Sequence, residues 1–443
     1  MWGGEKPFAS PKQWLPQPAV AMQDAPGWAC RTRGDRRAEK KDVAGERDMK
    51  TKSRKIDTLL THAGRDPANN FGVVNPPVYH ASTILYPTVK SIEERQKIRF
   101  APGTYTYGRH GTPTTSALEE AVAAVEGGFR AVALPSGAAA IYVAILAFVK
   151  PGDHILVADH VYGPNRSFVT GFLKRFGVEA TFYDPLIGAG IADLMRENTR
   201  VLFMESPGSL TFEVQDVPTL VAAAKARNVV TVLDNTWASP MFFHPLALGV
   251  DVSVVAGTKY IVGHSDVMVG FAICNEKSFT AVRSTVAELG YSIAPDDCYL
   301  ALRGLRTASV RMKQHDKQGM ALANWLTARP EVERVLHPAL PGHPGHEFWK
   351  RDFTGASGLF GVVLKPCPPA ALEAMLDGME LFGMGYSWGG FESLIIPSHP
   401  EALRTARPWH SAGPTLRIHA GLEDIDDLIA DLARSFERLN AAR

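Results

Sequence analysis

"RAVALPSGAAAIYVAILAFV", residues 130–149, is the stretch of this 443-residue chain that decides the fold class. A short apolar run, a Pro-Ser-Gly turn and an alanine-rich segment follow one another, which is the pattern of a buried strand leading into a helix. Short apolar runs recur at 153–159, 199–205 and 229–234, and the helical segment 220–228 precedes the last of them. Short apolar strands alternating with helices predict an α/β fold with a mostly parallel sheet covered on both faces.

Composition and charge are those of an ordinary globular protein. Hydrophobic residues make up 45% of the chain, and 47 Lys and Arg against 46 Asp and Glu leave a formal charge of +1. This balance favours a small or dipolar ligand over nucleic acid or an acidic membrane surface. The four cysteines are far apart, without metal-ligand spacing, so we expect no disulfide framework, no structural zinc and a cytoplasmic location.

The first 53 residues differ from the rest of the chain. They contain "RTRGDRRAEKKDVAGERDMK" (31–50), in which charged residues dominate, and we expect a disordered extension. The acidic residues argue against a transit peptide, and the missing apolar core argues against a secretory signal. A further hypothesis is that translation starts at Met49 and that the upstream stretch is a start-site artefact.

Two strand ends carry residues of opposite charge. The run 229–234 ends on Asp234, and "DVSVV" (251–255) ends just before Ala256-Gly257-Thr258-Lys259. Ligands of open α/β sheets bind beyond the carboxyl ends of the strands, so Asp234 and Lys259 are candidates for a site at the same edge. An isolated acid and lysine would more often form a buried ion pair.

A cofactor explains the pair better than an ion pair does. Gly137 and Ala138 open the helix after the first strand, where free backbone N–H groups can bind phosphate. Tyr162, just after residues 153–159, can cover a planar ring. Phosphate, aromatic ring, carboxylate and lysine together describe pyridoxal phosphate (PLP): Lys259 forms the Schiff base, and Asp234 keeps the pyridine nitrogen protonated. Each motif alone is also compatible with a purely structural role.

Residues 54–443 resemble the Cys/Met-metabolism PLP enzymes of fold type I, and among them the cystathionine β-lyases. The resemblance is carried by "YGRHGTPT", "PSGAAA", "MESPGSLTFEVQDVP", "DNTWA", "GTKYIVGHSD", "YSWGGFESL" and "LRIHAGLEDIDDLIADL". It implies a PLP-binding large domain at 111–305, a smaller α/β C-terminal domain at 306–443, and an N-terminal segment at 54–110 that contacts a neighbouring subunit. It also implies a homotetramer, built as a dimer of dimers.

The resemblance also assigns roles. It implies that Lys259 carries the cofactor and removes the Cα proton, with help from Tyr107 or Tyr162, and that Tyr162 stacks on the cofactor ring. The other implied cofactor ligands are the ring-nitrogen partner Asp234, the backbone phosphate donors Gly137 and Ala138, the hydroxyl donor Thr258, and the pair Tyr107 and Arg109, which reaches a neighbouring subunit's phosphate. The implied substrate ligands are Arg417 for the α-carboxylate, with Ser387 and Trp388 lining its pocket.

Several residues bear on the kind of elimination. Trp388 and Trp237, and "ESPGSL" in place of "ESPSNP", favour β-elimination of L-cystathionine to homocysteine, pyruvate and ammonia over γ-elimination. Ala256 replaces a serine that is frequent in the family, so one phosphate hydroxyl contact is expected either to be absent or to come from another residue. An alanine near 287 replaces a tyrosine of the β-lyases, and whether Tyr291 substitutes for it stays open.

Other functions and other residues are weighed against this interpretation. The related γ-lyase, γ-synthase and cysteine desulfhydrase activities stay open. A binding protein without activity would have no evident use for the whole set of Lys259, Asp234, Tyr162 and Arg417. A nicotinamide-dependent reductase would need a Gly-x-Gly-x-x-Gly turn after the first strand, and this sequence has none there. We expect His264 and Asp266 to order a loop, and we expect no metal site. The histidines of 337–346 should lie in a surface loop, and Arg303 and Arg306 should form salt bridges at a domain interface. Residues 422–439 should form an amphipathic helix with its apolar stripe at Leu422, Ile425, Leu428, Ile429 and Leu432.

Overall fold

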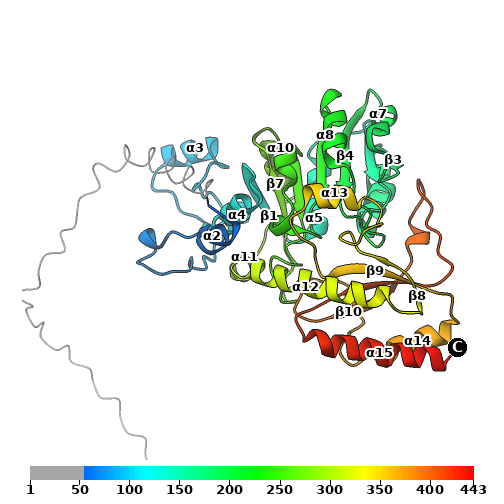
Figure 1. Cartoon of the computed structure of the whole chain (residues 1–443). Helices are drawn as coiled ribbons and strands as arrows, with labels where there is room; N and C mark the ends of the chain where they lie inside the picture. The colour runs from blue at the N-terminus through cyan, green and yellow to red at the C-terminus, as the bar shows by residue number, and fades with distance from the viewer. Residues whose placement is uncertain (1–53) are drawn as a thin grey trace, which may run out of the picture. The chain divides into compact units, whose positions relative to one another are not determined.

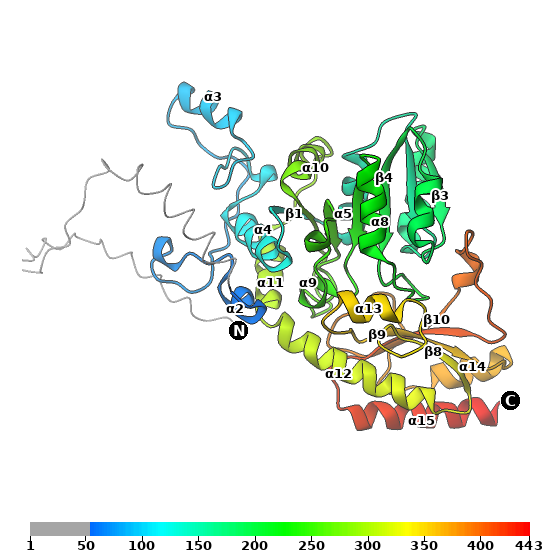
Figure 2. The ribbon, with the colours of Figure 1, turned by 45° about the horizontal axis from the view of Figure 1, so that its top comes forward.

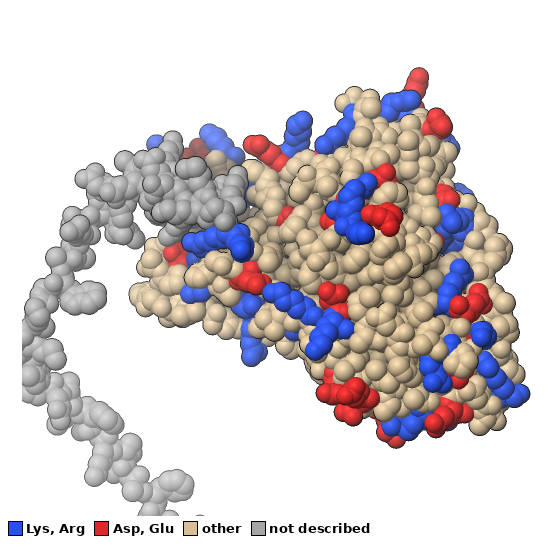
Figure 3. All heavy atoms as spheres, viewed as in Figure 1, with Lys and Arg blue, Asp and Glu red and all other residues tan. Residues whose placement is uncertain are grey.

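The computed structural model describes residues 54–443, shown in Figure 1. The predicted disordered extension at 1–53 and the predicted start at Met49 lie outside the described residues. No helix in the described part is long and apolar enough to cross a membrane. Figure 3 shows basic and acidic side chains interspersed over one face, which fits the near-neutral net charge.

A seven-stranded sheet forms the centre of the larger half of the molecule. Its strand order is β1-β7-β6-β5-β4-β2-β3, and β2 to β6 pair in parallel while β7 runs antiparallel to both neighbours. This confirms the predicted α/β fold with a mostly parallel sheet. The strands are β1 (Arg130–Leu134), β2 (His154–Ala158), β3 (Glu179–Tyr183), β4 (Thr199–Glu205), β5 (Val230–Asp234), β6 (Val252–Val255) and β7 (Gly270–Cys274).

The central strands are mostly apolar because helices cover the sheet (Figure 2). All residues of β2, β6 and β7 are buried, whereas the edge strand β3 is partly exposed. The covering helices include α4 (Pro113–Glu126), α5 (Gly137–Leu146), α8 (Val217–Ala226) and α10 (Glu276–Glu288). Helix α4 starts at a Thr112 capping box and ends at Gly127 in the left-handed conformation, so its length follows from local sequence signals.

A second, four-stranded antiparallel sheet has the order β10-β11-β9-β8. Its strands are β8 (Val332–Leu336), β9 (Leu359–Leu364), β10 (Leu394–Ser398) and β11 (Thr415–His419). Helices α12 (Ala308–Thr327), α14 (Pro369–Asp377) and α15 (Ile425–Ala441) pack beside it, yellow to red in Figure 1, and contribute to a separate apolar cluster. The division into domains at residue 305 stays a prediction.

Helix α15 is shorter than the predicted amphipathic helix. It begins after Asp424, whose side chain accepts the backbone N–H of Asp426 at 2.9 Å. Leu422 therefore precedes the helix, while Leu428 and Leu432 are buried as expected. A capping aspartate, rather than the first apolar residue, sets the start of the helix.

The segment before α4 exposes many large apolar side chains. It contains α2 (Ile56–His62) and α3 (Val89–Lys97), drawn in blue in Figure 1. Phe71 is fully exposed, and so large an apolar surface on one segment is typical of a protein–protein interface. The exposed residues are Phe71, Val73, Val74, Val78, Tyr79, Leu85, Val89, Ile92, Ile98 and Tyr107.

The prediction of a surface loop for the 337–346 histidines is wrong for two of them. His337 and His343 are buried. The ring of His343 hydrogen-bonds the carbonyl of Phe212 at 2.7 Å through Nε2, and the Nδ1 atom of His337 accepts the N–H of Ala339 at 3.1 Å. The Pro and Gly residues turn this segment back onto the 212–214 region instead of leaving it in solvent. The described residues contain no group of three or more potential metal ligands.

The prediction of interface salt bridges for Arg303 and Arg306 is also wrong. Neither arginine forms an ion pair with a described carboxylate. Instead, Arg306 donates to the carbonyls of Leu60 and Ala63 at 2.6 and 2.8 Å. These carbonyls lie at the end of α2, where the last turn of a helix leaves acceptors free, so Arg306 caps that helix.

Candidate active site

Lys259 lies in the turn after β6 and points toward the loop that precedes β10. Its Nζ atom donates to the hydroxyl of Ser387 at 2.5 Å and lies 5.2 Å from the centre of the Trp388 ring. Gly389 has a φ of +87°, and a Cβ on it would lie 3.0 Å from the Lys259 Cα. Only a glycine lets this loop pass so close to the lysine.

Arg417 reaches the same loop from β11. Its Nη2 atom donates to the carbonyl of Ser387 at 3.0 Å. Ser387 adopts a φ of +80°, which is unusual for a residue with a side chain. This conformation lets its hydroxyl face Lys259 while its carbonyl faces Arg417. Ser387 contacts both Lys259 and Arg417, and Trp388 lies beside Lys259. The roles of Ser387, Trp388 and Arg417 in substrate binding stay predictions.

Asp234 ends β5 and is tied to the lysine turn through Thr236. Its Oδ1 atom accepts the backbone N–H and the hydroxyl of Thr236 at 2.9 and 2.5 Å, and that hydroxyl accepts the N–H of Ala256 at 2.8 Å. Burial raises the pKa of the Asp234 carboxyl, while the two Thr236 bonds and the charge of Lys259 oppose the rise. The carboxylate is thus held rigidly beside the turn that carries the lysine.

The four predicted key residues interact electrostatically. Burial, followed by the positive charge of Arg417, lowers the pKa of Lys259 to about 8, and Asp234 opposes this. Burial raises the pKa of the Tyr162 hydroxyl, and Asp234 raises it further while Arg417 lowers it. Lys259, Asp234, Tyr162 and Arg417 therefore share one site, and the lysine amine is partly neutral near physiological pH.

The start of α5 offers free backbone donors to a phosphate. Gly137 and Ala138 are its first residues, and their N–H groups have no acceptor within the helix. A Cβ on Gly137 would lie 2.4 Å from the Cβ of Ala256, so only a glycine lets the start of α5 pack this closely against the turn that carries Lys259. Thr258 differs from expectation: its hydroxyl donates to the carbonyl of Val269 at 3.2 Å in this structure. Its role as a phosphate donor stays a prediction.

Glu205 belongs to the site although no sequence argument selects it. It ends β4 opposite Asp234 in the parallel ladder, and its carboxyl accepts the N–H of Tyr162 at 2.7 Å and the hydroxyl of Ser209 at 2.6 Å. Both carboxyl residues are buried, with 7% of each exposed. The strand-end argument that finds Asp234 applies equally to Glu205.

Asp159 is a second buried carboxylate near the site. It directly follows β2 and accepts bonds from Arg166, from the Arg404 side chain and from the backbone N–H groups of residues 405–407. Arg404 also pairs with Glu213 at 2.9 Å. The carboxylate thereby fastens the loop between β10 and β11 to the end of β2, three residues before Tyr162.

Tyr107 and Arg109 are not brought to this site within one chain. Tyr107 is exposed and packs edge-on against His110. Arg109 donates to the carbonyl of Ala287 at 2.8 Å, on α10. No described contact joins either residue to Lys259, and their roles stay predictions that require a second copy of the chain. Tyr291 lies near Tyr142 and does not contact Lys259.

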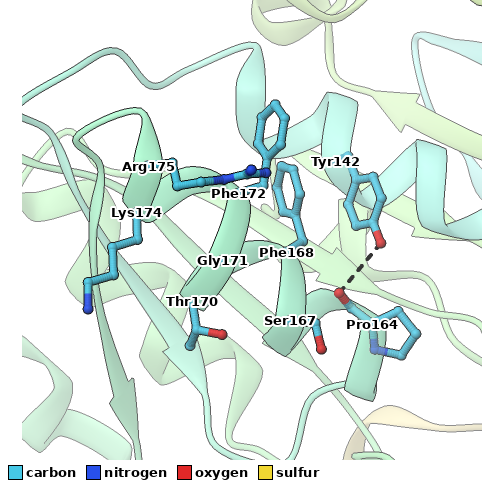
Figure 4. A pocket seen from close by; sticks show the side chains of 9 residues that line it. All are labelled: Tyr142, Pro164, Ser167, Phe168, Thr170, Gly171, Phe172, Lys174 and Arg175. Atoms are coloured by element: carbon cyan, nitrogen blue, oxygen red, sulfur yellow. Dashed lines mark hydrogen bonds between the residues drawn. The ribbon is translucent and has the colours of Figure 1, made fainter.

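An open hollow lies beside the site, on the segment that follows Tyr162 (Figure 4). Tyr142 from α5 stacks on Phe168 with ring centres 4.1 Å apart, and Phe168 stacks on Phe172 at 5.3 Å. The hydroxyl of Tyr142 donates to the carbonyl of Pro164 at 3.4 Å. None of the predicted site residues lines this hollow.

Comparisons with known proteins show the family of this chain. Residues 57–437 match the model of the Cys/Met metabolism PLP-dependent enzymes. The cystathionine beta-lyase MetC of Escherichia coli K12 is 45% identical over 87% of this chain and 99% of its own length. The L-alanine/L-glutamate racemase of Wolbachia pipientis wMel is 42% identical over 87% of this chain and 98% of its own. A solved cystathionine gamma synthase from Xanthomonas oryzae pv. oryzae, 30% identical, superposes with a TM-score of 0.80 over 88% of this chain and 100% of that one.

Proposed function

We propose that this chain, which belongs to the Cys/Met metabolism PLP-dependent enzyme family, cleaves the Cβ–S bond of L-cystathionine to give homocysteine, pyruvate and ammonia. The observation that carries the proposal is the meeting of Lys259, Asp234, Tyr162 and Arg417. Lys259 and Arg417 both donate to Ser387, and Asp234 is tied to the lysine turn through Thr236. On the neighbouring strand, Glu205 lies opposite Asp234 and accepts the N–H of Tyr162. The name of the 45% identical Escherichia coli relative supports β-elimination as the reaction.

The free N–H groups at the start of α5 and the buried Asp234 carboxylate fit pyridoxal phosphate. Lys259 would carry it as a Schiff base, Asp234 would bind the ring nitrogen, and Tyr162 would cover a ring face. The N–H groups of Gly137 and Ala138 would bind the phosphate. When bound, the cofactor withdraws electrons from the Cα of an amino acid and so makes the Cα proton acidic.

The side chains supply binding and proton transfer. Arg417 would bind the α-carboxylate with its guanidinium, which matches a carboxylate in shape and charge. The Nζ atom of Lys259 would take the Cα proton and then give a proton to the leaving sulfur, and Tyr107 or Tyr162 would assist. A pKa near 8 suits both steps, because the amine must accept and release a proton at neutral pH. Ser387 would keep the amine directed at the pocket.

We further propose that the enzyme is a homotetramer and works in the cytoplasm. The exposed apolar segment 71–107 supports an interface between copies of the chain. Tyr107 and Arg109 would then reach the phosphate in a neighbouring subunit. The cytoplasmic location rests on cysteine usage: Cys274, Cys298 and Cys367 are free thiols in the described residues.

Absorbance and product analysis test the proposal. The purified protein is scanned for the cofactor band and then given L-cystathionine, with pyruvate and 2-oxobutyrate assayed separately. A band that disappears in Lys259→Ala, together with pyruvate, is the expected result. Formation of 2-oxobutyrate would indicate γ-elimination instead. Loss of optical activity from alanine or glutamate without pyruvate would indicate the reaction that names the Wolbachia relative.

A further inference from the structure

Two carboxyl groups lie side by side at the edge of the large sheet. Glu205 and Asp234 hold the same register position on the neighbouring parallel strands β4 and β5, and both are buried. Neither forms an ion pair with a described Lys, Arg or His at 4.0 Å or less. Two buried carboxylates at facing register positions of neighbouring strands, without a cation in ion-pair range, disfavour each other's charge, so one of them is expected to keep a proton.

Glu205 is the member of the pair that holds the proton. Asp234 accepts two bonds from Thr236, and the charge of Lys259 favours its ionised form. Burial and the neighbouring Asp234 both raise the pKa of Glu205, while the bonds from Ser209 and Tyr162 oppose the rise. As a neutral acid, Glu205 still accepts the N–H of Tyr162 at Oε2, 2.7 Å away, and its Oε1–H group can donate to the hydroxyl oxygen of Ser209, 2.6 Å away, in place of the bond that this hydroxyl donates to the carboxylate.

We propose that Glu205 is a positioning residue, which as a neutral acid leaves Asp234 as the single anion of the pair and fixes the backbone at Tyr162. The anion and the tyrosine are the two groups that would hold the cationic ring of the cofactor, so the inference rests on the proposed function. Glu205 bonds the backbone of Tyr162 just where α6 (Gly163–Ser167) begins. Loss of that bond would free the tyrosine ring while leaving Lys259 and Arg417 in place.

Three variants separate the parts of this proposal. Glu205→Gln copies the neutral acid, with one acceptor and one donor. Glu205→Leu removes both hydrogen bonds at similar volume, and Ser209→Ala removes only the hydroxyl partner. The matched control is Glu119→Gln in α4, whose carboxyl also accepts a backbone N–H, that of Ala133, at 3.0 Å. Each apoenzyme is titrated with pyridoxal phosphate by absorbance, and its visible circular dichroism and thermal midpoint are recorded.

We expect Glu205→Gln and the control to bind within about threefold of the unaltered protein. Glu205→Leu should bind at least tenfold more weakly, with an altered visible dichroism, and Ser209→Ala should lie between them. Cofactor affinity and dichroism in Glu205→Leu equal to those of the unaltered protein would overturn the proposal, as would a Glu205→Gln as weak as Glu205→Leu. If Glu205→Leu does not fold, unchanged dichroism and affinity in Ser209→Ala would overturn it.

The same experiment distinguishes the two proposals. If the unaltered protein binds the cofactor and forms pyruvate while Glu205→Leu behaves normally, only the role of Glu205 is wrong. If the unaltered protein shows no cofactor band, the proposed function fails and the role of Glu205 fails with it.

Discussion

Replacing Glu126 by glutamine should stabilise the protein, and more so as the pH rises. Glu126 lies in α4 with 1% of its surface exposed, and no described cation pairs with it. Its carboxyl accepts bonds from the hydroxyl of Ser253 and, at 3.2 Å, from the side-chain amide of Asn235. Burial raises the pKa of Glu126 from 4.5 to about 8. The folded protein therefore keeps this group protonated at neutral pH, whereas the unfolded chain releases the proton.

The size of the effect follows from linkage. Between the unfolded pKa of 4.5 and the folded pKa of about 8, the folded state binds the extra proton, so the free energy of unfolding falls as the pH rises. The slope is about 1.4 kcal/mol per pH unit for one group. From pH 5 to pH 8 the loss is thus at most about 4 kcal/mol. The amide of Glu126→Gln does not titrate, so this loss of stability is absent in the variant. Its carbonyl oxygen can still accept the hydroxyl of Ser253.

Urea unfolding of both proteins at pH 5.5, 6.5 and 7.5, at one protein concentration, measures this difference. The gain of Glu126→Gln over the unaltered protein should be small at pH 5.5 and should grow by about 1 kcal/mol or more per unit. Glu119→Gln serves as the control, because its partly buried carboxyl has an arginine partner. The difference in the free energy of unfolding between Glu119→Gln and the unaltered protein should change much less with pH. A difference for Glu126→Gln that stays constant with pH would refute the buried neutral acid.

Three further predictions concern the site. The rate at which the apoenzyme takes up pyridoxal phosphate should rise with pH and level off above about pH 8, because only the neutral Lys259 amine reacts. Stopped-flow absorbance measures this rate, and a rate that did not change with pH would contradict the prediction. Arg417→Lys should raise the KM for cystathionine about 10- to 100-fold with a smaller change in kcat, since a charge-assisted hydrogen bond contributes about 1.5–3 kcal/mol. An unchanged KM would mean that the substrate α-carboxylate binds elsewhere. Gly389→Ala should lower both the thermal midpoint and the uptake of the cofactor. The alanine Cβ would lie 3.0 Å from the Cα of Lys259, and the backbone φ there is +87°. A normal midpoint together with normal uptake would be evidence against that contact.

The sequence predicts the four central parallel strands well but misses the edge strand β3. Strands β2, β4, β5 and β6 lie within one residue of the predicted runs, because a strand buried on both faces is mostly apolar, whereas β3 is partly exposed and has no such run. The antiparallel direction of β7 is not predicted. Strand direction depends on pairing with β1 and β6, which are distant in sequence, and no local pattern records it.

The site is predicted where chemistry and strand ends coincide, as at Asp234 and Lys259. Glu205 ends a predicted strand just as Asp234 does, so the same argument could have selected it. Asp159 escapes prediction because its partners, residues 404–407, are brought to it only by the fold. His337 and His343 are misplaced because Pro and Gly indicate a turn, but not that the turn packs back onto the fold, where His343 meets the carbonyl of Phe212.

The Asp159 contacts also determine when the protein can be completed during synthesis. Arg404 follows Asp159 by 245 residues, and Arg417 comes later still. At roughly 5–20 residues per second, a ribosome needs on the order of 10 to 50 s to cover that distance. Throughout this interval the Asp159 carboxylate has Arg166 as its only cationic partner among those described, because its second one, Arg404, is not yet made. The loop that carries Arg404 can therefore dock on the end of β2 only near the end of synthesis, and a chain released early by premature termination would lack this contact.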